Sequence, residues 1–182
     1  FIYNQRKGIL GKIQYNLVNS LLHSCYIDSI LVYSEHEKLY YEQLFSLKEK
    51  FQSVNLGLED LTQGITQQGE KPFILSAGRS NRDYEFLFRE LNNIQYPVKI
   101  VCDALPGGTR GNIQIYDRIY YEDFFQMIAD CHCVVISLDN PQISSGQLVI
   151  LQAMEFGKPV IVTKSETVGD YIQDGKQGYI IE

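Results

Sequence analysis

The stretch "SSGQLVILQAMEFGKPVIV", residues 144–162, indicates the fold more clearly than any other part of the sequence. A Ser-Ser-Gly turn leads directly into an apolar helical segment, Gly157 ends that segment, and an apolar strand follows. The start of a helix leaves several N–H groups unpaired and carries the positive end of the helix dipole. We therefore predict an anion or diphosphate site at this turn. The simpler alternative is that Ser144 or Ser145 only caps the helix.

Gln152 interrupts the apolar surface of this helix, whose other residues are almost all aliphatic. A polar amide in such surroundings either faces solvent or forms a hydrogen bond with a group in a cleft. A ligand rich in hydroxyl groups would satisfy it.

From Phe73 onward, short apolar runs alternate with amphipathic helical patterns. The runs are continuously apolar, which is typical of parallel strands buried on both faces. We predict a Rossmann-like, doubly wound α/β domain over residues 73–182, truncated at its C-terminus. The expected strands are 73–78, 98–103, 112–116, 133–138, 159–163 and 178–182, and the expected helices are 84–91, 121–131, the segment after the Ser-Ser-Gly turn, and 167–173.

Residues 1–57 form a shorter α/β pattern of helix, strand, helix and strand. Ser34 followed by Glu37 has the spacing of a capping box and predicts the start of the second helix. This block is too short to close its own core. We interpret it as the C-terminal part of an incomplete N-terminal domain, joined by a polar linker at 58–72 to the second domain.

Composition limits the functional classes. The chain has 182 residues, 45% of them hydrophobic, and a net charge of −6, which argues against a general nucleic-acid binder. It contains no apolar run near the roughly 20 residues of a membrane span and no signal-peptide pattern. The "CHC" at 131–133 favours buried, reduced thiols over a metal site. We expect a cytoplasmic protein.

Two loops that follow predicted strands contain candidate ligand-binding residues. After the first strand, Gly78 permits a tight turn, and Arg79 and Arg82 are suited to bind a phosphate. The alternative is that both arginines pair with surface carboxylates such as Asp83 or Glu85.

The second loop is Asp117–Ile119, whose backbone could pair with the edge of a nucleobase while Tyr116 or Arg118 covers its face. The alternative is that Asp117 or Tyr120 only starts the next helix. A third loop, "LPGGTRGN" at 105–112, is expected to be a mobile surface loop without chemistry.

These loops, in this order, resemble the C-terminal part of a GT-B glycosyltransferase of family 4, also called glycosyl transferases group 1. The resemblance covers about 110 residues and is carried by "FILSAGRSNRDYEFL", "NIQIYDRIYYEDFFQMIADCHCVVISL", "SSGQLVILQAMEFGKPVIVT" and "VGDYIQDGKQGYIIE". The resemblance implies a donor-binding domain of a sugar transferase, preceded by the end of an acceptor-side domain. It also implies retention of the anomeric configuration without a metal or other cofactor.

Site roles follow from the resemblance. Arg79 would bind the donor diphosphate, and the Asp117–Ile119 loop would hold the base. Ser145, Gly146 and Gln147 would present backbone donors to the phosphate and sugar.

The sequence departs from the family pattern at three positions. The family usually has two glutamates where this sequence has Ser144 and Gln152, and a lysine where it has Tyr84. Arg82 could supply the missing positive charge. An amide both donates and accepts hydrogen bonds, whereas a carboxylate only accepts them. Because the hydrogen bonds of a carboxylate are stronger, we expect weaker anchoring of the ribose at Gln152.

The leading hypothesis is therefore a hexosyltransferase-type enzyme acting on a nucleotide-sugar donor and a glycan or lipid-linked acceptor, as in polysaccharide biosynthesis. We expect the fragment alone to be inactive, and the missing domain offers a route to peripheral contact with the inner face of a membrane. One alternative is a non-catalytic GT-B-like nucleotide-binding or regulatory module. A nucleotide-sugar epimerase ranks last, because the predicted cleft lacks well-placed acid/base histidines.

Overall fold

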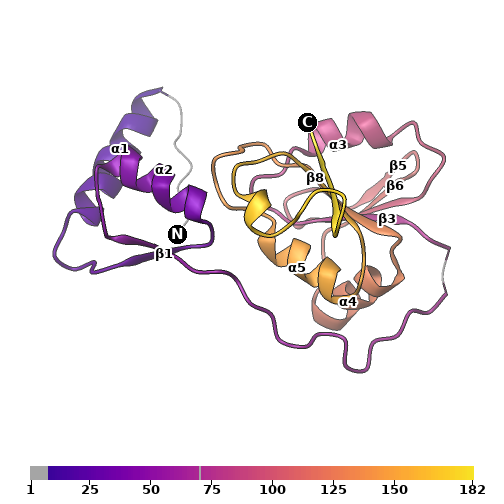
Figure 1. The fold of residues 1–182 in the computed structure, drawn as a ribbon. Coiled ribbons are helices and arrows are strands. Elements are labelled where there is room, and N and C mark those ends of the chain that lie inside the picture. Colours follow the sequence, from indigo (N-terminus) through magenta and orange to yellow (C-terminus); the bar gives the residue numbers. More distant parts are fainter. Residues whose placement is uncertain (1–7, 70) are drawn as a thin grey trace.

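The computed structural model describes residues 8–69 and 71–182, which form two α/β units joined by an extended segment (Figure 1). The first unit contains α1 (Gly8–Leu22), β1 (Ile30–Val32), α2 (Glu35–Phe45) and β2 (Phe51–Ser53). Its two strands pair in parallel. Between residues 54 and 73, the described residues form no helix or strand.

The second unit is a seven-stranded sheet with the order β5-β6-β4-β3-β7-β8-β9. Six strands run parallel, and only β5 pairs antiparallel. The strands are β3 (Ile74–Ala77), β4 (Val98–Val101), β5 (Gly108–Arg110), β6 (Ile113–Tyr116), β7 (Cys133–Ile136), β8 (Val160–Thr163) and β9 (Gly178–Ile181). Its helices are α3 (Tyr84–Leu91), α4 (Tyr121–Asp130), α5 (Gln147–Glu155) and the short 3-10 helix η1 (Val168–Asp170).

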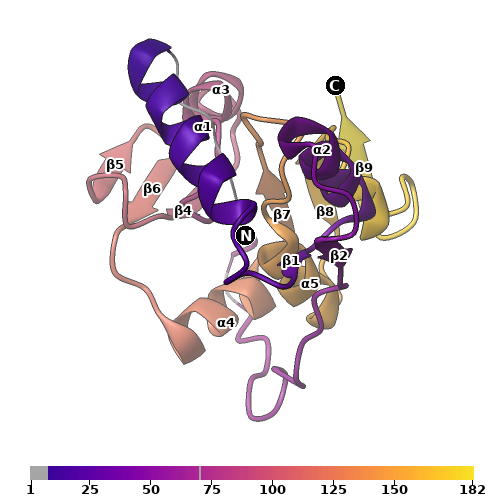
Figure 2. The same ribbon diagram turned by 90° about the vertical axis from the view of Figure 1, so that its left-hand side faces the viewer.

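Helices cover both faces of this sheet, as Figures 1 and 2 show. Alternate strand residues point to opposite faces. Leu75 and Val134 belong to the core under α4 and α5, whereas Val98 and Ile100 belong to the core under α3. The predicted doubly wound parallel architecture is therefore confirmed.

The strand order reverses beside β3, the first strand of the sheet. The chain proceeds from β3 through β4 to β6 on one side and then returns to β7, β8 and β9 on the other side. Such a reversal leaves a crevice at the carboxyl ends of the central strands, where open α/β sheets bind ligands.

The segment 105–112 differs from its expected form. Residues 108–110 pair with β6 as an edge strand, with Gly111 and Asn112 as the connecting turn. Asn112 Nδ2 donates to the backbone oxygens of Leu91 and Tyr96, at 2.9 and 2.8 Å. The prediction of a mobile loop is wrong, because strand pairing and the Asn112 side chain fix this hairpin to the sheet.

The first unit packs around a small aromatic core that a residue of the second unit completes. Tyr41, Phe45 and Phe51 are almost completely buried in it, and Tyr15 stacks on Phe45. Ile143, from the second unit, belongs to the same cluster. The two units are therefore packed together through apolar contact.

Candidate active site

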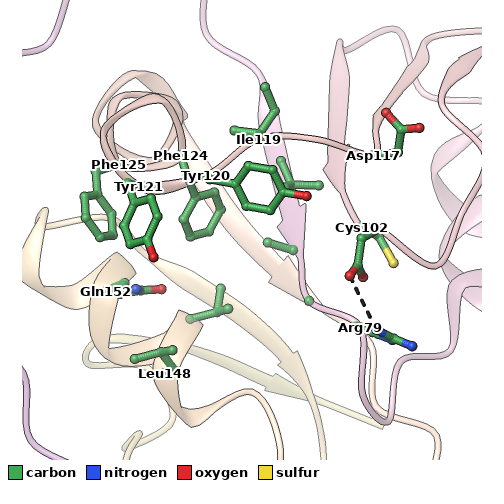
Figure 3. A pocket seen from close by; sticks show the side chains of 15 residues that line it. Arg79, Cys102, Asp117, Ile119, Tyr120, Tyr121, Phe124, Phe125, Leu148 and Gln152 are labelled. Carbon is green, nitrogen blue, oxygen red and sulfur yellow. Dashed lines mark hydrogen bonds and ion pairs between the residues drawn. The ribbon is translucent and has the colours of Figure 1, made fainter.

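A cavity of about 440 Å³ lies at the carboxyl ends of β3 and β4, where the strand order reverses (Figure 3). Its volume is within the range of small-molecule sites. Its walls come from the ends of β3 and β4, the loop before α4, and the first turns of α4 and α5. The lining residues are Ala77, Gly78, Arg79, Val101, Cys102, Asp103, Asp117, Ile119, Tyr120, Tyr121, Phe124, Phe125, Leu148, Val149 and Gln152.

Four aromatic residues at the start of α4 form one wall of the cavity: Tyr120, Tyr121, Phe124 and Phe125 (Figure 3). The helical spacing alone would place the two phenylalanines in the core, and they are indeed partly buried against it. Their role in lining the cavity was missed. The sequence signal was available as the aromatic run "YYEDFF", which begins at Tyr120 after the short loop that follows a strand, where ligand sites of parallel sheets occur.

Gln152 lies on the opposite wall, on α5 (Figure 3). Its side chain is buried, with a residue exposure of 7%. Its Oε1 atom has no hydrogen-bond partner among the described residues. The solvent-facing alternative is wrong, and an unpaired buried acceptor is free to bind a ligand hydroxyl or N–H group.

Arg79 stands exposed at the rim of the cavity. Its Nη1 lies 3.5 Å from Oδ2 of Asp103, at the end of β4. The sequence suggested Asp83 as a carboxylate partner for the arginines. Asp83 instead caps α3 by accepting a hydrogen bond from the Phe86 N–H at 2.8 Å. Because an exposed ion pair is weak, Arg79 can exchange this partner for a phosphate.

Arg82 is turned inward and does not line the cavity. Its Nε donates to the Ala77 oxygen at 3.1 Å, and its Nη1 donates to the oxygen of Ser80 at 2.8 Å and to Oγ of Ser145 at 3.1 Å. No carboxylate of the described residues pairs with it. Burial lowers the pKa of Arg82, yet a guanidinium stays protonated at neutral pH. A positive charge therefore lies beneath the turn before α5.

In that turn, neither Ser144 nor Ser145 caps α5. Gly146 occupies the N-cap position of α5, with φ at 87°, and no side chain caps the helix. Ser145 Oγ donates to the Ser80 oxygen at 2.9 Å, and the Ser144 N–H donates to Oε1 of Glu37 at 3.1 Å. The capping interpretation is wrong. Among residues 8–69 and 71–182, no side chain caps the N–H groups at the start of α5, as an anion site requires.

The loop before α4 contributes Asp117 and Ile119 to the cavity, whereas Arg118 is exposed and lies outside its lining. Tyr120 occupies the N-cap position of α4 without a side-chain cap. Asp117 likewise makes no capping hydrogen bond to α4 within the described residues. Helix capping therefore does not explain why Asp117 and Tyr120 stand in this loop.

Tyr84, which stands at the lysine position of the family pattern, donates its hydroxyl to the Gly78 oxygen at 2.5 Å. Burial raises the pKa of Tyr84, so the phenol stays neutral. Tyr84 therefore fixes the turn after β3 and supplies no charge to the site.

No group of histidine, cysteine and carboxylate side chains in residues 8–69 and 71–182 could hold a metal ion. Cys131 and Cys133 are buried thiols, as expected, and burial raises the pKa of Cys131 to about 12. No helix of this part of the chain is long and apolar enough to cross a membrane.

Comparisons with known proteins relate the second unit to one family. Residues 93–182 match the family model described as glycosyl transferases group 1. No curated protein matches the chain by sequence.

Several solved structures share the fold. Anabaena HepE in complex with UDP-glucose has a TM-score of 0.72 at 19% identity, covering 93% of this chain and 52% of that one. The pneumococcal O-GlcNAc transferase GtfA, in complex with UDP and GlcNAc, has a TM-score of 0.64 at 18% identity, covering 98% and 38%. Sucrose-phosphate synthase from Thermosynechococcus elongatus has a TM-score of 0.70 at 14% identity, covering 93% and 48%. This chain thus spans about half or less of the length of these structures.

Proposed function

We propose, from the match of residues 93–182 to the family model described as glycosyl transferases group 1, that the chain is the donor-binding part of a retaining glycosyltransferase. The cavity at the strand reversal carries this proposal, because it combines an aromatic wall, an unpaired buried acceptor on Gln152 and an arginine at its rim. A nucleoside diphosphate has a base, a ribose and two phosphates, which require these three kinds of group.

In this arrangement the base binds at the Asp117–Ile119 loop, against the aromatic wall. The ribose hydroxyls pair with Gln152, and the diphosphate meets Arg79 and the N–H groups of Gly146 and Gln147. Asp103 releases Arg79 when the phosphate binds.

Transfer breaks the bond between the anomeric carbon and the diphosphate oxygen. Negative charge grows on the diphosphate, and fixed cations and helix-end dipoles stabilise it. Arg79 contacts the diphosphate with its positive charge. Arg82 adds a positive electrostatic potential from beneath the turn before α5 without touching the ligand. An acceptor hydroxyl bonds to the anomeric carbon on the face that the leaving group occupied, and its proton passes to the departing diphosphate oxygen. No step of this reaction needs a metal ion.

The acceptor belongs to the acceptor-side domain, of which residues 1–57 are the C-terminal part. We propose a glycan or lipid-linked hydroxyl as the acceptor, a hexose as the transferred sugar, and a cytoplasmic location with peripheral membrane contact through the acceptor-side domain. The chain alone binds the donor without completing transfer.

Titration calorimetry with nucleoside diphosphates tests the donor site. UDP is the first probe, because structures of HepE and GtfA contain UDP. We expect one nucleoside diphosphate to bind in the presence of EDTA. The substitution Arg79→Ala should weaken its affinity about tenfold through loss of a charge-assisted bond, and Gln152→Ala should weaken it severalfold.

Arg89→Ala is the matched control, because Arg89 is exposed and lies outside the cavity lining, where it pairs with Glu90 at 2.8 Å and lies over the Phe86 ring. It should leave the affinity unchanged. Absence of binding by every nucleoside diphosphate would refute the proposal.

A second candidate is a non-catalytic nucleotide-binding module. It is favoured by one observation, the neutral residues Ser144 and Gln152 at positions where the family usually has glutamates. The two candidates differ in turnover, which is measured on the full-length protein with a nucleotide sugar that it binds. If the protein is an enzyme, nucleoside diphosphate should be released. If it is a non-catalytic module, none should be released.

A further inference from the structure

Glu37 is a buried carboxylate that belongs to the first unit but contacts the second. It lies on α2 with 0% of its surface exposed. Its Oε1 accepts a hydrogen bond from the Ser144 N–H at 3.1 Å, and its Oε2 has no partner among the described residues. Burying a polar group without hydrogen-bond partners for all its atoms is costly, so a carboxyl group at this place requires an explanation.

The capping box accounts for only half of this arrangement. Ser34 Oγ accepts from the Glu37 N–H at 3.4 Å, as the sequence predicts. In a complete capping box, the glutamate side chain returns to the N–H of the capping residue. Here the Glu37 carboxylate instead reaches Ser144, 107 residues away in sequence.

The turn before α5 is consequently held on two sides, by the Arg82 guanidinium and by the Glu37 carboxyl group. Arg82 contacts Ser145 Oγ from the loop after β3, at 3.1 Å, and Glu37 contacts the Ser144 N–H from α2, at 3.1 Å. These partners come from different units of the chain. The Ser144 Oγ and Gln147 Nε2 atoms remain buried and unpaired beside them.

The surrounding contacts hold Glu37 in position. Ile143, the residue before Ser144, packs into the aromatic core of the first unit. At the start of α2, the Glu35 N–H donates to Oδ2 of Asp170 at 3.2 Å. The Glu37 contact is therefore part of a continuous interface between α2 and the loops that follow β7 and β8.

We propose that Glu37 is a positioning residue that sets the turn before α5 for diphosphate binding and so couples docking of the first unit to the donor site. This inference rests on the proposed donor site. Glu37 acts through the Ser144 N–H and does not touch the ligand. A lost acceptor would leave that N–H unpaired and allow the Ser144–Gly146 turn to open, displacing the start of α5.

Hydrogen–deuterium exchange of the peptide covering Ser144–Gln147 tests the positioning directly. We expect Glu37→Ala to accelerate exchange of this peptide at least about tenfold and to weaken nucleoside diphosphate binding by a similar factor. Glu37→Gln keeps an acceptor oxygen at the same length and should stay within about threefold of the unchanged chain in both measurements.

Glu37→Asp is the second variant, in case the alanine variant does not fold. It keeps the carboxyl group on a side chain that is one methylene shorter, so it should accelerate exchange of the turn. Glu42→Ala, on the same helix, is the charge-matched control and should change neither measurement. A glutamine variant as damaged as the aspartate or alanine variant, or an aspartate variant with unchanged exchange, would overturn the proposal.

The two proposals fail differently. If UDP and the other nucleoside diphosphates do not bind the unchanged chain, the proposed function fails, while exchange of the turn still shows whether Glu37 holds it. If UDP binds and Glu37→Asp leaves both exchange and affinity unchanged, the donor site stands and the role of Glu37 is refuted.

Discussion

Gly146 shows how one residue shapes the candidate site. Its φ of 87° lies in the left-handed region, where a side chain is strained. A Cβ atom at this position would lie 3.3 Å from Cγ2 of Ile136 and 3.5 Å from Nη2 of Arg82. Glycine therefore allows both the turn and the close approach of the Arg82 guanidinium to the start of α5.

We predict that Gly146→Ala lowers the free energy of unfolding by about 2 kcal/mol, from backbone strain and crowding together. Gly157→Ala is the matched control, since Gly157 has a φ of 64° but no atom within 4 Å of the added Cβ. The control should cost only about 1 kcal/mol. Urea denaturation measures both, and equal losses would contradict the crowding at Gly146.

Among the elements, β9 depends on one close backbone contact. Gly178 pairs with Val160 of β8, and a Cβ on Gly178 would overlap the Val160 backbone oxygen. A backbone atom in a strand cannot move aside as a flexible side chain can. The glycine in "QGYII" is thus required by the sheet, although the sequence pattern only marks the start of the strand.

We predict that Gly178→Ala destabilises the chain by about 3 kcal/mol because β9 must shift away from β8. Gly169→Ala, in η1, is the control: no atom lies within 4 Å of its added Cβ, and its φ is not positive. That substitution should change stability by no more than about 0.5 kcal/mol. The two substitutions are compared by urea denaturation, and similar effects would show that β9 tolerates the side chain.

The hairpin at β5 shows what can be predicted for an element and what cannot. The Gly111-Asn112 dipeptide is a known hairpin signal. The flanking residues 108–110, Gly-Thr-Arg, have little strand preference of their own, and all three are exposed. Their pairing comes from β6, a neighbour that local sequence patterns do not specify.

At the scale of the whole molecule, Tyr171 links the two units at a second point. Its hydroxyl donates to the Tyr33 oxygen at 2.7 Å and accepts from the Leu56 N–H at 3.2 Å. Both partners lie just beyond strands of the first unit. Burial raises the pKa of Tyr171, so the hydroxyl stays protonated at neutral pH and both hydrogen bonds remain.

We predict that Tyr171→Phe lowers the free energy of unfolding by about 1–2 kcal/mol and accelerates hydrogen exchange at Leu56. Tyr179→Phe is the control, because Tyr179 is 62% exposed and its hydroxyl forms no hydrogen bond within the described residues. Thermal unfolding and exchange mass spectrometry measure the two effects. Unchanged exchange at Leu56 would show that Tyr171 does not hold the units together.

The sequence by itself determined the parallel sheet and its helices, because continuous apolar strands and helical periodicity are local patterns that a buried sheet imposes. It also indicated the loops at Arg79, Asp117 and Ser144, because the carboxyl ends of parallel strands meet at one edge. Gln152, which lines the cavity with a buried and unpaired oxygen, was recognisable as a polar residue on an apolar helix.

Only the tertiary structure decided which partner each side chain meets. The Glu37 carboxylate contacts Ser144, Arg82 turns beneath Gly146, and the aromatic residues of α4 face Gln152 across a cavity. These contacts join segments far apart in the chain. Their geometry depends on how two units and seven strands pack together, whereas local sequence patterns specify only the elements.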